Sequence, residues 1–139
     1  HAVTFSGQAS TALYADLAEN YKADSKYEPG TVLIFGGDEE VTTTQLKDDT
    51  RVAGVVSEKP GYLMNDGLKG DNVIALALQG RVPVKVVGIV KKGDLLVSAS
   101  TRGFAISNNR AGVGTVIGKA ISSKDDAGAG TVEVVVGRV

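Results

Sequence analysis

Short apolar segments alternate with glycine-rich polar turns from residue 31 to the end of the chain. Thr31–Phe35, Arg51–Ser57 and Val73–Leu78 are largely apolar, as is typical of short strands buried on both faces. Thr131–Val136 alternates instead: its even-numbered valines fall on one side, and Thr131 and Glu133 fall on the other. These patterns predict a β-rich fold in which most strands are only four to eight residues long.

The middle of the chain predicts a β-hairpin. Gly80-Arg81 links the preceding strand to an apolar run over Val82–Val90, and Lys91–Asp94 forms a tight turn before Leu95–Ser98. Pro83 cannot donate to a strand ladder, so this strand should begin at Pro83 or lie at a sheet edge there. The remaining predicted strands are Val41–Thr44 and Val113–Ile121.

The N-terminal part has a different pattern. Residues 1–9 look like an arm, either the end of a fibre shaft or a tag remnant. Ser10 is a candidate N-cap for a helix of two to three turns. The apolar face of that helix would comprise Tyr14, Leu17, Ala18 and Tyr21, at spacings i, i+3, i+4 and i+7. We therefore expect one all-β domain over residues 10–139, a small barrel or barrel-like sandwich, with one short N-terminal helix and the arm.

Composition excludes several classes of site. The 139 residues suffice for one domain with its own core. The chain has no cysteine and a single histidine, His1, so thiolate chemistry is excluded and a multi-histidine metal site is disfavoured. A formal net charge of −1 argues against a nucleic-acid partner, and no apolar run approaches the roughly 20 residues of a membrane span. We expect no metal, no cofactor and no membrane insertion.

Few residues suggest catalysis. Asp16 and Glu19 are three residues apart on the predicted helix, where two carboxylates can share a proton, although a solvated helix face is the commoner interpretation. Ser57 lies two residues before Lys59, which resembles a nucleophile and its base, although such a pair at a strand end usually marks a turn. These residues would matter only in a self-cleaving protein.

Recognition is more plausible than catalysis for the loops. Tyr62 lies near a Pro-Gly turn, and tyrosine rings can stack on sugars. Amide and guanidinium groups that suit carbohydrate hydroxyls or anionic sugars occur together in the loop formed by Ser107, Asn108, Asn109 and Arg110. We expect receptor contacts at these residues, because loops on a rigid β-scaffold commonly carry recognition.

Six segments in order resemble the C-terminal domains of tailed-bacteriophage fibre and appendage proteins. They are Ala12–Tyr21, Glu28–Gly30, Val52–Ser57, Leu78–Val86, Lys92–Leu96 and Ile117–Ala120. The resemblance implies a homotrimeric virion domain at the distal end of a tail fibre. Such a domain is made in the host cytoplasm, is extracellular on the released virion, and binds a bacterial surface polysaccharide or another receptor.

Two alternative functions remain open. The chain is also loosely similar to the intramolecular-chaperone domains called peptidase G2, through a head that would map to Tyr14, Ala15 and Glu19. That similarity implies self-cleavage after fibre trimerisation, with Asp16 or Glu19 as acid or base and Ser57 or Ser10 as nucleophile. A capsid decoration protein is the other alternative, because small glycine-rich β-barrels also serve there.

Overall fold

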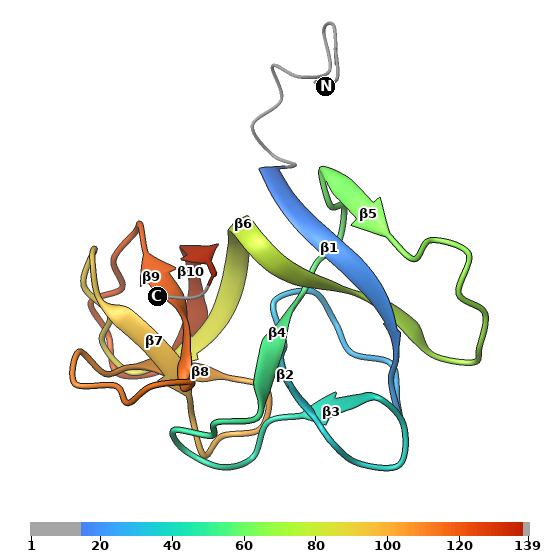
Figure 1. The fold of residues 1–139 in the computed structure, drawn as a ribbon. Coiled ribbons are helices and arrows are strands. Elements are labelled where there is room, and N and C mark those ends of the chain that lie inside the picture. The colour runs from blue at the N-terminus through green and yellow to red at the C-terminus, as the bar shows by residue number, and fades with distance from the viewer. Residues whose placement is uncertain (1–14, 138–139) are drawn as a thin grey trace, which may run out of the picture.

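The computed structural model describes residues 15–137, which form ten strands and no helix. The strands are β1 (Ala15–Lys22), β2 (Val32–Phe35), β3 (Val41–Thr43), β4 (Val52–Val56), β5 (Tyr62–Met64), β6 (Val73–Val87), β7 (Leu95–Ser98), β8 (Ala105–Ser107), β9 (Val116–Ala120) and β10 (Ala129–Val136). The predicted all-β class is confirmed. Figure 1 shows that the strands form two groups, which are joined through the long curved strand β6.

The C-terminal group is a closed barrel of five strands. β10 pairs with β6 and β9, β9 pairs with β7, and β7 pairs with β8. The parallel pairing of β8 with β6 at Val86 closes the ring. Closure gives each of these strands a neighbour on both sides over at least part of its length, which limits the edge-to-edge pairing by which small β-proteins aggregate. The barrel predicted from the rhythm of turns is therefore present.

The N-terminal group is an open sheet built on the first half of β6. β1 pairs with β6 on one side and with β5 on the other, while β4 connects β6 to β2 and β3. The two strands predicted on either side of Gly80 are one continuous strand, which bends where Gly80 adopts a φ of +108°. β6 thus belongs to both groups and fixes their relative position.

Pro83 lies in the middle of β6 rather than at its start. It pairs with Glu133 of β10, and its nitrogen faces the opposite side, because Lys85 two residues on donates in that direction to the Gly30 carbonyl 3.0 Å away. On that side β1 pairs as far as Arg81 and β8 begins at Val86. The predicted edge position of Pro83 is therefore correct. Its nitrogen, which cannot donate a hydrogen bond, faces a side of β6 that has no partner strand at that residue.

The predicted hairpin between Val82–Val90 and Leu95–Ser98 is wrong. The turn at Lys91–Asp94 exists, with the Asp94 nitrogen 2.9 Å from the Lys91 carbonyl. The strand after it pairs with β8 and β9, however, and β6 takes β10 as its antiparallel partner instead. The strands before and after this turn thus pair with other strands of the closed barrel rather than with each other.

The predicted N-terminal helix is also wrong within the described residues. Ala15–Lys22 is an eight-residue strand with a neighbour on each side. The helical spacing of Leu17, Ala18 and Tyr21 covers only two turns, and long-range strand pairing outweighs so short a pattern. The predicted arm, the Ser10 cap and Tyr14 lie outside the described residues.

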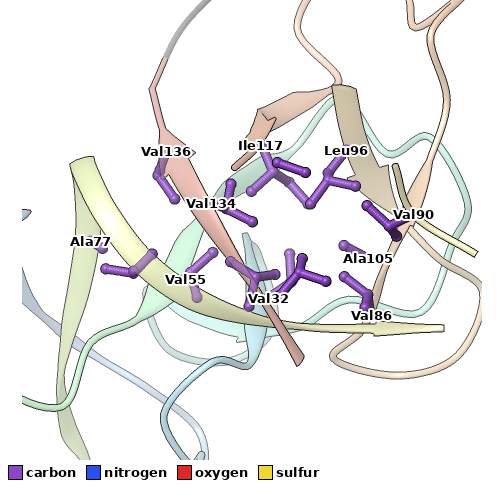
Figure 2. Close-up of a cluster of buried hydrophobic side chains, with 14 residues drawn as sticks. Val32, Val55, Ala77, Val86, Val90, Leu96, Ala105, Ile117, Val134 and Val136 are labelled. Carbon is purple, nitrogen blue, oxygen red and sulfur yellow. The ribbon is translucent and has the colours of Figure 1, made fainter. Parts of the chain in front are cut away.

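Two hydrophobic clusters fill the molecule, and β2 contributes to both. Val32 belongs to the barrel cluster with Val84 and Val134, whereas Leu33 belongs to the second cluster with Leu76. Figure 2 shows aliphatic side chains from several strands pointing into the barrel interior. The predicted two-sided burial of β2 is thus confirmed, as is the inward face of β10 formed by its even-numbered valines. Each such buried side chain contributes about 1.5–3 kcal/mol.

Candidate functional site

The loop that follows β8 is held by hydrogen bonds to the carboxylate of Asp94. The Ser107 hydroxyl donates to Asp94 Oδ2 at 2.7 Å, and the Asn109 amide donates to Oδ1 at 3.0 Å. The Leu95 backbone nitrogen donates to Asn109 Oδ1 at 2.8 Å. The Asn109 amide and the Ser107 hydroxyl hold the pKa of Asp94 below its usual range. The polar groups of these two side chains therefore form hydrogen bonds within the chain, although Asn109 itself is exposed.

Asn108 is engaged in the same way. Its amide donates to Asp48 Oδ1 at 3.0 Å, and its carbonyl oxygen accepts the Arg110 backbone N–H at 3.0 Å. The second bond is a local turn of the kind that asparagine commonly makes. Arg110 is exposed. Of the four predicted receptor residues in this loop, Asn109 and Arg110 are exposed, and the Asn109 side chain is held by its bonds to Asp94 and Leu95.

Tyr62 lies elsewhere. It begins β5, pairs with Leu17 of β1, and exposes 63% of its surface. Figure 1 shows β5 beside β1, away from the barrel strand β8 that leads into the 107–110 loop. The structure therefore does not gather the predicted receptor residues into one site, and their role in binding stays a prediction.

Asp16 and Ser57 do come together. Both residues are buried, with Asp16 5% exposed and Ser57 8% exposed, and the Ser57 hydroxyl lies near enough to the Asp16 carboxyl to influence its pKa. Within the described chain, Asp16 Oδ2 has no hydrogen-bond partner. Burial raises the pKa of Asp16, opposed by the Ser57 hydroxyl and by the backbone N–H groups of Asp16 and Gly61. Asp16 or Glu19 was expected as acid or base and Ser57 or Ser10 as nucleophile. Of these, the described chain brings together Asp16 on β1 and Ser57 just beyond β4.

Glu19 is separate from this pair. Residues three apart on a strand point to opposite faces, so Glu19 does not share the face of Asp16. Its Oε1 accepts the Tyr21 hydroxyl at 3.0 Å. The predicted pairing of Asp16 with Glu19 depended on the helix, and it fails together with the helix.

An apolar groove that the sequence analysis missed lies where β1, β6, β9 and β10 meet. It has a volume of about 910 Å³. Its lining includes the apolar side chains of Leu17, Leu78, Ile121 and Val135 and the cations Lys92 and Lys119. The sequence feature that could have revealed this groove is Val135. It falls on the outward face of an alternating strand, where polar residues are expected, and it is 46% exposed.

A second hollow of about 510 Å³ is mainly acidic, with Asp24, Asp38, Glu39 and Asp71 on its walls beside Lys22. Among residues 15–137 no group of histidine, cysteine and acidic side chains has the arrangement of a metal site. The described residues also include no helix long and apolar enough to cross a membrane.

Comparisons with known proteins find the fold but no sequence family. No family model matches the chain, and no curated protein matches its sequence. Among solved structures, the C-terminal fragment of bacteriophage phi29 gene product 12 is similar over 87% of this chain and 99% of that fragment, with a TM-score of 0.63 and 14% identity. The N base of the phi29 head fibre gp8.5 is similar over 86% of this chain and 92% of its own, with a TM-score of 0.53 and 18% identity. The chain therefore has a fold that occurs in bacteriophage fibre and appendage proteins.

Proposed function

We propose that this chain is a structural domain of a bacteriophage virion, at the distal end of a tail fibre or appendage, where three copies assemble and contact the host surface. The observation that carries the proposal is the fold itself, which the chain shares with nearly the whole phi29 gene product 12 fragment. The domain would be made in the host cytoplasm and exposed outside the cell on the released virion.

Binding by such a domain rests on multivalency. Three equivalent weak sites on one rigid tip give an avidity that a single site lacks. The exposed Arg110 guanidinium suits anionic groups of a surface polysaccharide, and the exposed Tyr62 ring suits a sugar face. Ser107, Asn108 and Asn109 then act in this proposal by holding the loop in shape, because their polar groups bond within the protein.

Competition for adsorption tests receptor binding. Purified domain added to host cells should slow adsorption of the phage, and Arg110→Ala and Tyr62→Ala should each weaken this competition about tenfold. Lys47→Ala removes an exposed cation from a different loop and should compete like the unaltered domain. If the domain does not compete at any concentration, its role is structural alone.

The similarity to a head fibre supports a second location. A domain of this fold on the capsid would be closer to the decoration alternative, and the phi29 gp8.5 N base is the reason to keep that alternative. Head and tail attachment predict different positions on the same particle. Labelling of intact virions separates them.

Self-cleavage is the second candidate function, and the Asp16–Ser57 pair favours it. The Ser57 hydroxyl oxygen would attack a peptide carbonyl carbon while Asp16 accepts the proton. The amine would then leave with a proton, and water would hydrolyse the resulting ester. Because both side chains are buried, the substrate would be a segment of the same chain. Scission of a longer precursor should stop in Asp16→Asn and Ser57→Ala and continue in Glu19→Gln. An uncut unaltered precursor would exclude this function.

A further inference from the structure

Several of the hydrophobic side chains that line the apolar groove are more exposed than those of the barrel core. Leu17, Leu78 and Ile121 are only partly buried, and Val135 is almost half exposed. None of the described residues that line it is acidic, whereas Lys92 and Lys119 both line it and are both exposed. An apolar surface rimmed by charge of one sign is typical of a protein contact rather than of a solvated face.

The strand register places the charges around Val135. On the outward face of the barrel, Val135 of β10 lies opposite Lys119 of β9 on one side and opposite Arg81 of β6 on the other. Residues directly opposite on neighbouring strands have Cβ atoms about 5 Å apart. The groove therefore favours an occupant that offers an apolar group together with several negative charges.

The turn between β2 and β3 has this chemistry. Phe35 ends β2 and is 46% exposed, and the chain then runs through two glycines to Asp38 and Glu39. Both carboxylates are exposed, and the described part of the chain gives neither of them an ion pair. Figure 1 places β3 and the groove strands β9 and β10 on different sides of the molecule, so the turn does not reach the groove of its own copy.

We infer that the apolar groove binds the β2–β3 turn of a second copy of this chain, with Phe35 against the apolar wall and Asp38 and Glu39 near Lys119 and Lys92. Because the two surfaces differ, the contact is head-to-tail, and three such contacts close a ring. The inference deepens the proposed function and rests on it, because it names the contact that builds the trimer.

Charge reversal tests the contact by sedimentation velocity of the full 139-residue chain over a range of concentrations. Lys92→Glu with Lys119→Glu should raise the dissociation constant of the trimer at least about tenfold, and Asp38→Lys with Glu39→Lys should do the same. The four changes combined should bring the constant back to within about threefold of the original, because the charges again match. Lys47→Glu with Arg102→Glu, two exposed cations outside the groove, should leave it within about twofold.

The outcomes separate the contact from the assembly. A trimer that none of the reversals weakens overturns the proposed contact and leaves the trimeric domain standing, with another surface as its interface. A chain that stays monomeric at all concentrations overturns both. Loss of assembly in both double variants without recovery in the combined one also overturns the pairing, provided that far-ultraviolet circular dichroism shows all the variants folded.

Discussion

The 107–110 loop and the apolar groove are both parts of the barrel surface, but they use their side chains in opposite ways. In the loop, Ser107, Asn108 and Asn109 bond to carboxylates of the same chain. In the groove, hydrophobic groups remain accessible beside Lys92 and Lys119. The polar side chains of the loop, which suit sugar binding, thus form hydrogen bonds within the chain. The accessible surface lies instead in the groove, around the outward-facing Val135. A candidate binding residue is informative only once its internal partners are known.

Asp94→Ala should have the largest effect, because it removes the acceptor on which the loop depends. Ser107, Asn109 and the Lys91 backbone nitrogen would lose bonds to a charged oxygen, and the free energy of unfolding should fall by about 2–3 kcal/mol. Urea titration measures this change. Asp66→Ala, which removes an exposed carboxylate on another turn, should alter it by less than about 0.5 kcal/mol. Equal losses in the two variants would show that the loop does not depend on Asp94.

The same network predicts acid sensitivity. The folded pKa of Asp94 lies below its unfolded value of about 3.9, so its stabilisation is fully present above that pH and is lost as the pH falls through the folded pKa. The difference in unfolding free energy between the unaltered chain and Asp94→Ala should therefore shrink below about pH 4. A difference that stays constant down to pH 2 would contradict the role given to the carboxylate.

Asp16→Asn should stabilise the protein by about 1 kcal/mol at neutral pH. Burial raises the folded pKa of Asp16, so the protonated form stabilises the fold below the unfolded pKa, and that benefit is lost as the pH rises through the folded pKa. Asparagine resembles the neutral acid. The gain should be absent near pH 3, where Asp16 is protonated in the unaltered chain too. Destabilisation at pH 7 would mean that the charged form is needed.

Val135→Ser should have the smallest effect on folding. The side chain is half exposed and faces outward from β10, so the free energy of unfolding of the dissociated chain should change by less than about 0.5 kcal/mol. Its inward neighbour Val134 is fully buried, and Val134→Ser should cost several times more. Denaturant titrations at high dilution compare the two valines. A loss at Val135 as large as at Val134 would make the groove part of the core.

The strands could largely be predicted from the sequence, because short apolar runs such as Val32–Phe35 and the alternation ending at Val136 are local patterns. Strand partners could not, since β6 pairs with residues about 50 positions away, and a hairpin turn at Lys91–Asp94 gives no sign of that. β1 shows the same limit, because its helical spacing is local and its pairing with β5 and β6 is not. The proximity of Asp16 and Ser57 follows from that pairing. The two residues could therefore be named as candidates from the sequence, but their proximity could not be predicted.

Immunogold labelling of purified virions tests the central claim most directly. An antibody raised against the 139-residue chain should label intact particles of the phage that encodes it, at the tips of its fibres or appendages, and peptides of the domain should be found in those particles by mass spectrometry. Particles that carry neither label nor peptides, from a lysate in which the same antibody detects the protein, would contradict the assignment to the virion.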